Sequence, residues 1–317
     1  MLKKLIERLR CKPEPEQEEA IPSAHAWWKE AVFYQAGKEI KNEIKNEIRL
    51  DYFEALGVDA LIVDSIPRDA ETDIKFIAKY GTENADGFML EIDINDPQIH
   101  THLQGLLGDF LMAEVPEIDI SLSRKLTDSY RNELNLVVRP PVALAGLKNF
   151  CIKHLNADCG HGWNTLVLNR QDAETIPIAK MLALLQFTLR GSPLIYQGEE
   201  LGKKGTEFSW EEADKQELDA TSMLSFYRDL IALRRSAPAL IYGALTFLNQ
   251  RDKNFLSFSR ILSLSSENFY IEANLKNKGR RSKAPESAEF LLGNYGTPGG
   301  KEGKLKPYEA RIYKLTN

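Results

Sequence analysis

The feature that most constrains the fold is an apolar segment that leads directly into a short strand-like run and an acidic turn. Residues 176–190 are almost wholly apolar, and residues 191–202 read Gly-Ser-Pro-Leu-Ile-Tyr-Gln-Gly-Glu-Glu-Leu-Gly. The first segment predicts a buried helix, and the run Leu-Ile-Tyr predicts a buried strand that ends in a glycine-bounded turn. A helix that feeds a buried strand is a repeating unit of a parallel α/β sheet, which places its functional residues at the carboxyl ends of the strands.

Similar units occur along most of the chain. Helices are predicted at 38–49, 50–57, 97–113 and 176–190, and strands at 31–35, 58–63, 88–94, 118–122, 134–138, 165–168 and 194–196. The helix over 50–57 is expected to stop at Gly57, a usual signal for a helix end. A further strand around Cys151 brings the count to eight, which predicts a (β/α)8 barrel over residues 26–238.

The pattern of apolar and polar residues changes after residue 238. Apolar runs at 245–248, 255–260, 269–274 and 310–315 alternate with turn-rich, charged segments. This pattern predicts a small antiparallel β-sandwich domain over residues 239–317. Residues 1–25 form a basic segment and a linker: residues 1–10 have apolar residues at helical spacing and a basic opposite face, and residues 13–19 are rich in proline and glutamate. Residues 1–10 can lie on a membrane surface or form a transient helix before the linker. The linker that follows them favours the second interpretation.

Composition excludes several classes of function. The formal net charge is −5 and no concentrated basic face is evident, which argues against a nucleic-acid partner. No run approaches the length needed to span a bilayer, so no transmembrane segment is expected. Three cysteines (Cys11, Cys151 and Cys159) match neither a disulfide framework nor a zinc site, and the histidines have no neighbouring ligands, so we expect a cytoplasmic protein without a metal.

Several motifs resemble the α-amylase superfamily, glycoside hydrolase family 13, in its α-glucosidase and oligo-1,6-glucosidase branch. They occur at 27–35, 50–63, 163–169, 179–183, 188–202 and 305–310, in the order of the family. The resemblance implies a (β/α)8 barrel followed by a β domain, with a role in carbohydrate metabolism. The chain is short for this branch. Asn95 runs almost at once into a predicted helix, so the domain that the family inserts after its third strand is expected to be absent. The predicted helix over 38–49 replaces a calcium-binding loop, so neither structural calcium nor another cofactor is expected.

The resemblance also assigns positions to the substrate-binding and nucleophile motifs. An asparagine–histidine pair ends the third strand in the family, and here Asn95 is kept while Asp96 takes the place of the histidine. The nucleophile strand reads Gly-Phe-Arg-x-Asp in the family. Residues 115–121 set against it place Asp119 at the arginine and Ser121 at the nucleophile, and a slip of two residues would make Asp119 the nucleophile instead. A serine hydroxyl without a base is a poor replacement for a nucleophilic carboxylate.

The other catalytic positions are also altered. Arg139 lies near the place of the acid/base glutamate and cannot exchange protons near neutral pH. Gln171 replaces a histidine of the seventh-strand motif, while Asp172 is the one catalytic carboxylate that is retained. Asp73 is what remains of a substrate-positioning tyrosine–aspartate pair. Because such groups act together, these changes predict that hydrolysis has been lost.

Three functions remain open. The first is a catalytically inactive member of the family that binds an α-glucoside, an oligosaccharide or a protein partner. The second is a glycosidase with residual or altered activity through Asp119 and Asp172. The third is an interaction subunit resembling the heavy chains of amino-acid transporters, whose opening double tryptophan is similar to Trp27 and Trp28. These tryptophans could stack on a sugar, but core packing is the more usual role near the start of a domain. Glu199 and Glu200 are interpreted as structural, since neighbours on an extended chain point in opposite directions.

Overall fold

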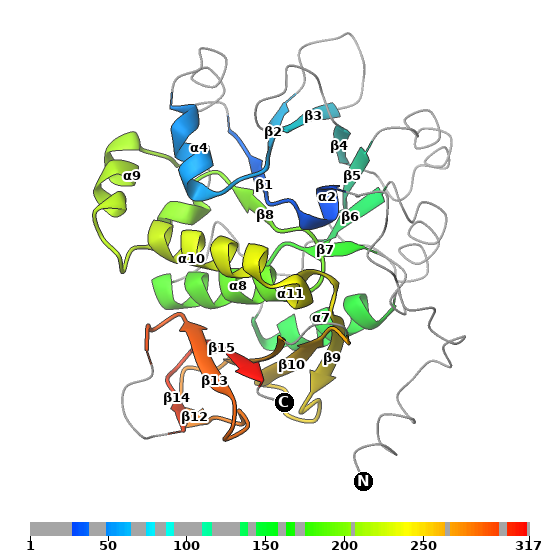
Figure 1. Cartoon of the computed structure of the whole chain (residues 1–317), viewed down its shortest axis with the longest axis vertical. Helices are drawn as coiled ribbons and strands as arrows, with labels where there is room; N and C mark the ends of the chain where they lie inside the picture. The colour runs from blue at the N-terminus through cyan, green and yellow to red at the C-terminus, as the bar shows by residue number, and fades with distance from the viewer. Residues whose placement is uncertain are drawn as a thin grey trace.

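The structure is a computed structural model, and it contains an eight-stranded sheet, a five-stranded sheet and a two-stranded ribbon, with helices between and around the two larger sheets (Figure 1). It describes residues 27–37, 49–64, 74–79, 87–91, 110–115, 134–138, 144–157, 163–168, 175–203, 207–263, 267–297 and 303–315. The description below concerns these residues.

The larger sheet has eight strands, which follow one another in an arc (Figure 1). They are β1 (Phe33–Gln35), β2 (Ala60–Asp64), β3 (Ile74–Lys79), β4 (Gly87–Glu91), β5 (Phe110–Val115), β6 (Leu134–Val138), β7 (Asn164–Leu166) and β8 (Leu194–Tyr196), in the order β7-β6-β5-β4-β3-β2-β1-β8. All neighbours are parallel except that β3 runs antiparallel to both β2 and β4. The predicted parallel α/β sheet is therefore present, with one reversed strand.

The sheet reaches eight strands by a different route from the one predicted. The segment around Cys151 is not a strand: it belongs to α7 (Leu144–Ala157), where Leu147, Cys151 and Leu155 are buried at four-residue spacing along one helical face. Strand β6 therefore pairs directly with β7. The end of the helix predicted over 97–113 is also wrong, because β5 begins at Phe110, and the strand predicted over 118–122 lies outside the described residues.

Side chains alternate between two sides of this sheet. One apolar cluster contains alternate residues of strands β1, β2 and β8: Phe33, Ala60, Ile62, Leu194 and Tyr196. The intervening residues Tyr34, Leu61 and Ile195 belong to the other cluster, together with the helices. Such alternation is the strand period of two, and it gives the sheet one inner and one outer face.

Side chains bridge the gap between β7 and β8, which are not paired to each other in the described sheet. The backbone N–H of Ser192 donates to Thr165 Oγ1 (2.8 Å), and Trp163 Nε1 donates to Ser192 Oγ (2.8 Å). Gln186 donates to the carbonyl of Leu194 (2.7 Å) and accepts from the amide two residues beyond β7 (2.7 Å). Because all of these groups are buried, they satisfy backbone atoms that a strand pair would otherwise satisfy.

Helices cover the outer face of the sheet at β8, β1 and β2. They are α4 (Leu50–Leu56), α8 (Ile176–Thr188), α9 (Trp210–Glu217) and α10 (Met223–Ser236), with a 3-10 turn η1 (Glu199–Leu201) after β8. Helix α11 (Pro238–Tyr242) contributes to both clusters, and α2 (Trp27–Glu30) packs through Trp28 in the cluster of the opposite face. Helix α8 is buried on nearly all sides, as its sequence predicts. The expected end of α4 at Gly57 is confirmed: this glycine has a φ of 92° and its N–H donates to the carbonyls of Phe53 and Glu54.

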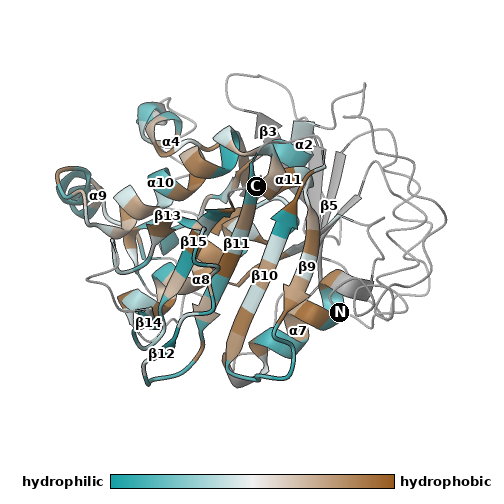
Figure 2. Ribbon diagram, turned by 60° about the horizontal axis from the view of Figure 1, so that its bottom comes forward, coloured by the Kyte–Doolittle hydropathy of each residue, from teal (hydrophilic) through white to brown (hydrophobic). Residues whose placement is uncertain are grey.

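The smaller sheet is antiparallel and follows α11 (Figure 2). Its strands are β9 (Ala244–Leu248), β10 (Phe255–Ile261), β11 (Asn268–Asn274), β13 (Glu289–Gly293) and β15 (Ala310–Leu315), in the order β13-β15-β11-β10-β9. A two-stranded ribbon of β12 (Arg280–Arg281) and β14 (Lys304–Leu305) accompanies it. The predicted short β strands are present, but the sandwich is reduced: one sheet packs on helices, and beside it is the ribbon.

Buried cations join the smaller sheet to the rest of the molecule. Arg260 on β10 is fully buried and donates to the carbonyls of Thr188 (2.9 Å) and Ile241 (2.9 Å), which lie at the ends of α8 and α11. Arg234 on α10 donates to the carbonyls of Phe187 (2.9 Å) and Gly191 (2.6 Å). These charge-assisted bonds occupy carbonyls at helix ends that would otherwise be unsatisfied.

In the part of the chain that the structure describes, no helix has the length and apolar character needed to cross a bilayer.

Candidate functional site

The carboxyl ends of the parallel strands mark the edge where a site is expected. Gln35 ends β1 and pairs in register with Tyr196, the last residue of β8. On the far side of the sheet Glu91, the last residue of β4, pairs in register with Glu114 of β5. Between them Asp64 ends β2 and pairs with Lys75, because the reversed strand β3 begins at this edge. The described edge therefore contains three acidic positions.

The ends of β1 and β8 are fixed to each other by one glutamine. The backbone N–H of Gln197 donates to the carbonyl of Gln35 (3.1 Å), and its side-chain Oε1 accepts from the backbone N–H of Gly37 (2.7 Å). A Cβ at Gly37 would lie 2.9 Å from that oxygen, so a larger residue there would displace the end of the Gln197 side chain. The oxygen Oε1 of Gln35 is buried and has no hydrogen-bond partner among the described residues.

A buried carboxyl group lies behind this edge, on the helical side of the sheet. Oε1 of Glu200, on η1, accepts hydrogen bonds from the hydroxyls of Tyr34 on β1 (2.9 Å) and Tyr52 on α4 (3.0 Å). All three side chains are buried, and Oε2 of Glu200 has no partner within the described part of the chain. One carboxyl group thus holds the turn after β8, the first strand and a helix together.

Burial controls the protonation of this group. Loss of solvation raises the pKa of Glu200 to about 7, while the hydrogen bonds from Tyr34 and Tyr52 oppose that rise. Burial, followed by the nearby Glu200 carboxylate, raises the pKa of both tyrosines well above the usual value. Because Glu200 is fully buried, it cannot reach a substrate. Its geometry supports a structural role, as the sequence indicated.

The structure corrects the reason for which Glu199 and Glu200 were assigned a structural role, namely that they lie on an extended chain. Glu199 and Glu200 lie on the 3-10 turn η1 and not on an extended chain, and both are buried. Oε2 of Glu199 accepts from the backbone N–H of Tyr196 (3.3 Å). Both glutamates therefore face into the protein. The described residues contain no group of three or more histidine, cysteine or acidic side chains that could hold a metal ion.

Comparison with known proteins shows what the chain is similar to. The family model for the α-amylase catalytic domain matches residues 163–229, which extend from β7 into α10. The oligo-1,6-glucosidase of Parageobacillus thermoglucosidasius is 22% identical over 333 residues, with 70% of this chain and 59% of the relative covered. The chain is thus similar to the α-amylase catalytic domain over residues 163–229 and, at low identity over a longer span, to oligo-1,6-glucosidases.

Other members of the branch show how uneven the likeness is. The α-glucosidase of Pediococcus pentosaceus is 37% identical over 89 residues, covering 24% of this chain and 15% of the relative. The trehalulose synthase MutB from Pseudomonas mesoacidophila MX-45 has a TM-score of 0.68 at 14% identity, covering 91% of this chain and 99% of that structure. At that identity the likeness shows the fold.

The chain spans about three fifths of the length of the oligo-1,6-glucosidases that it matches. The alignment with the Parageobacillus enzyme runs over 333 residues but includes 70% of a 317-residue chain, so the enzyme carries sequence within the aligned span that this chain lacks.

The site residues carried over from the family fall outside the described residues. They are Asp73, Asn95, Asp96, Asp119, Ser121, Arg139, Gln171 and Asp172. The structure therefore does not test their placement. The predicted core role of Trp28 is confirmed: it is buried, and its ring contacts that of Trp163 edge-on at 6.1 Å.

Two features of the site were not predicted from the sequence. Glu114 was placed beyond the end of a helix, although the apolar run before it is short enough for a buried strand. Strand β3 was not predicted, although Ile74, Phe76 and Ala78 alternate with Lys75 and Lys79 in a pattern typical of a strand. The contact of Tyr34 and Tyr52 with Glu200 has no local signal, because these residues are about 150 positions apart.

Proposed function

We propose that this chain is a non-hydrolysing member of the α-glucosidase branch that binds an α-glucoside at the carboxyl edge of its larger sheet. The observation that carries the proposal is the composition of β5, which lies between the strands with the third- and fifth-strand motifs. This is the position of the nucleophile strand in the family. The three cysteines and the buried free thiol of Cys151 support a cytoplasmic location.

The sequence of β5 lacks the family's Gly-Phe-Arg-x-Asp pattern in either register. Matching the phenylalanine to Phe110 places Leu111 at the arginine and Ala113 at the nucleophile. Matching instead by register with Ile62 and Gln35 of the inner face places Met112 at the arginine and Glu114 at the nucleophile. In both cases an apolar residue replaces the arginine, and in the first case the nucleophile is lost as well.

The strand order supports the same proposal. The family's catalytic groups come from the carboxyl ends of several barrel strands, so their spacing depends on the order and direction of those strands. Here β3 presents its amino end at the edge, and β6 pairs directly with β7 without a strand between them. A change in spacing of about 1 Å can cost roughly 100-fold in rate, so we expect an altered strand order to prevent efficient hydrolysis.

A second candidate is hydrolysis through a new pair of carboxylates. Glu91 and Glu114 are register partners on adjacent parallel strands, and such strands lie about 4.8 Å apart. A retaining glycosidase needs two carboxyl groups about 5–5.5 Å apart. This candidate needs neither Asp119 nor Asp172.

Hydrolysis of p-nitrophenyl α-D-glucoside separates the two candidates. The proposal expects no turnover above background for the natural chain, together with saturable binding of isomaltose by calorimetry. Turnover that disappears in Glu114→Gln and in Glu91→Gln, but persists in Asp172→Ala, would establish the second candidate. Turnover that disappears in Asp172→Ala would overturn the proposal in favour of residual family chemistry. Absence of both turnover and sugar binding would overturn both candidates.

A further inference from the structure

The smaller sheet carries a concentration of positive charge at its outer end. Three segments contribute to it: the turn 249–254, the segment 275–283 with β12, and residues 304–306 with β14. Contacts between the segments hold them together: Leu275 N–H donates to the Asn254 carbonyl (3.0 Å), Arg280 pairs with Asp252 (2.6 Å), and Arg281 pairs in register with Lys304. Eight exposed cations define what we call the basic rim: Arg251, Lys253, Lys276, Lys278, Arg281, Lys283, Lys304 and Lys306.

The charge of the basic rim is not balanced locally. Its three segments contain nine of the 41 basic residues of the chain and one of the 46 acidic residues. That acidic residue, Asp252, is already paired with Arg280. The backbones of Lys276 and Lys278 are hydrogen-bonded to Asn274, and that of Arg281 is part of the ribbon, but the side-chain cations of these three residues have no hydrogen-bond or ion-pair partner among the described residues. The sequence was interpreted as lacking a concentrated basic face, and the structure corrects this, because folding joins segments that are separate along the chain.

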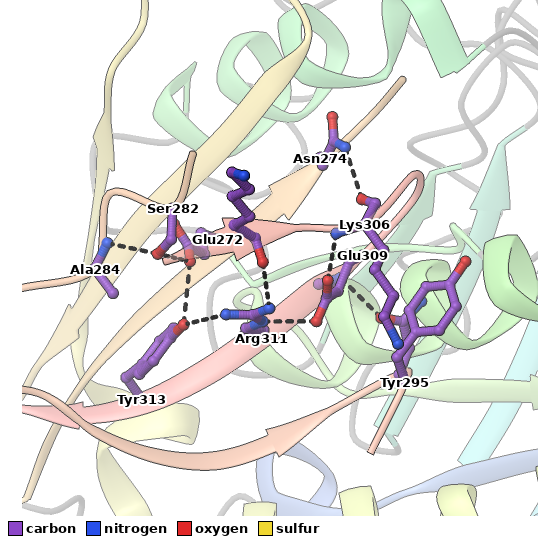
Figure 3. Close-up of polar contacts among 12 residues, drawn as sticks. Glu272, Asn274, Ser282, Ala284, Tyr295, Lys306, Glu309, Arg311 and Tyr313 are labelled. Carbon is purple, nitrogen blue, oxygen red and sulfur yellow. Dashed lines mark hydrogen bonds and ion pairs between the residues drawn. The ribbon is translucent and has the colours of Figure 1, made fainter. Parts of the chain in front are cut away.

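Carboxylates beneath the rim are buried and already bonded (Figure 3). Glu272 accepts from the backbone N–H of Lys283 (2.8 Å) and from the hydroxyls of Ser282 and Tyr313. Glu309 pairs with Arg311 (2.7 Å), whose guanidinium also donates to the carbonyl of Lys304 (2.7 Å). These bonds fix the backbone of both ribbon strands. The anions face inward, so they do not neutralise the exposed side chains of Lys276, Lys278 and Arg281.

We propose that the basic rim docks on an anionic phospholipid surface. The rim lies on a ribbon and turns at one end of the molecule (Figure 1), and exposed cations in such a place fit an extended charged surface. Lys and Arg near an anionic membrane each add to its attraction. The sequence also supplies a second signal: in residues 1–10, Leu2, Leu5, Ile6 and Leu9 recur at helical spacing among Lys3, Lys4, Arg8 and Arg10, a pattern typical of interfacial helices. Stable membrane attachment usually needs two such signals.

Nucleic acid is a poorer match for the same charge. Single-stranded binding relies on exposed aromatic faces, but cations already cover the rings near the rim. Arg280 lies 4.1 Å from the centroid of Phe255, and Lys306 lies 4.8 Å from that of Tyr295. The segments of the rim form turns and short strands, and contain no helix that could enter a major groove.

Cosedimentation of the full chain with vesicles tests the proposal. The probes are vesicles of phosphatidylcholine alone and of phosphatidylcholine with phosphatidylserine, at low and high salt. We expect binding to the second kind only, and its loss at high salt, where the screening length falls to about 3 Å at 1 M. The variant Lys278→Glu with Arg281→Glu should bind at least about tenfold more weakly. Lys153→Glu with Lys215→Glu, at exposed positions on α7 and α9, removes equal charge elsewhere and should bind as the natural chain does.

Several outcomes would overturn the proposal. Equal binding to both kinds of vesicle, or equal weakening by the two double variants, would show that the rim is not the docking surface. Undiminished binding of the Lys278→Glu, Arg281→Glu variant would assign attachment to the N-terminal segment. Rim-dependent binding of an oligonucleotide without any vesicle binding would assign the surface to nucleic acid. Because the substituted side chains are exposed, unchanged circular dichroism should show that both double variants fold.

Discussion

The protonation of Glu200 gives a quantitative prediction about stability. Its pKa is raised to about 7 in the folded protein by burial, against an ordinary value of 4.5. Below pH 4.5 it is protonated in both the folded and unfolded states. Between pH 4.5 and 7 only the unfolded state has lost the proton, so unfolding releases a proton and the free energy of unfolding falls as pH rises. A difference of about 2.5 pKa units corresponds to about 3 kcal/mol at 1.36 kcal/mol per unit.

The substitution Glu200→Gln should remove this loss. Glutamine keeps an oxygen that can accept from Tyr34 and Tyr52, and it stays neutral at every pH. Urea unfolding followed by tryptophan fluorescence from pH 4 to pH 8 gives the difference in unfolding free energy between variant and natural chain. We expect that difference to rise in favour of the variant by up to about 3 kcal/mol across pH 4.5–7. A flat difference curve, or one that falls with pH, would refute the reasoning.

Two controls make the measurement specific. Glu211→Gln removes a carboxylate from an exposed position on α9 and reports the effect of net charge alone. Tyr52→Phe removes one donor to the ionised Glu200, so its pKa should rise further and the fall in stability should extend to higher pH. Burial lowers the pKa of His154 to about 4, with a smaller effect from Lys153, so His154 costs stability as pH falls below 6.5. That opposite slope is common to all variants and cancels in the difference curve.

Three further predictions concern the core. Burial raises the pKa of the Cys151 thiol to about 12, so mass spectrometry should find this cysteine unmodified by iodoacetamide in the native protein and modified in urea; rapid native modification would contradict its burial. Ser192→Ala leaves the buried Nε1–H of Trp163 without its acceptor and should lower the free energy of unfolding by about 1–3 kcal/mol in urea titrations, whereas no loss would mean that the bridge between β7 and β8 is unimportant. Gly57→Ala forces an L-residue to a φ of 92° with its Cβ 2.8 Å from Ile231 Cγ2, so the melting temperature should fall by several degrees, and an unchanged value would contradict that geometry.

The sequence predicted best those segments that are buried on all sides or end at a glycine. Helix α8 and strand β8 were placed nearly to the residue, because uniform apolarity over 176–188 suits a buried helix and a short apolar run suits a buried strand. The end of α4 followed from Gly57 alone. In each case one local cause was sufficient to determine the local structure.

Predictions failed where a short apolar run fits both a helix and a strand. The run from Phe110 to Ala113 was assigned to the end of a helix, although the parallel pairing of β5 with β4 and β6 makes it part of a strand. Around Cys151 the opposite error occurred, because Leu147, Cys151 and Leu155 suit a helical face as well as an apolar run. Sheet pairing decides such segments, and it depends on residues far away in the sequence.

The basic rim also depends on residues that are far apart in the sequence, so local patterns could not predict it. Lys276–Lys283 was visible as a charged, turn-rich segment, but its meaning depends on the neighbours that folding supplies. The antiparallel pairing of β12 with β14 adds Lys304 beside Arg281, and the turn at 249–254 adds two more cations. A net charge of −5 therefore averages over a surface that is locally positive.

Residues 163–229 match the α-amylase model. The same segment contains buried polar side chains that hold elements of the core together. Ser192, Glu200 and Arg234 each satisfy partners from other elements, so replacing any one of them leaves a buried group unpaired. A side chain at the carboxyl edge of a barrel does not satisfy buried partners in this way, so its replacement lowers activity without destabilising the fold. A chain can therefore keep residues 163–229 recognisable while the catalytic positions change. For this reason the family match is evidence for the scaffold, and the turnover measurements on Glu114 and Asp172 have to decide the chemistry.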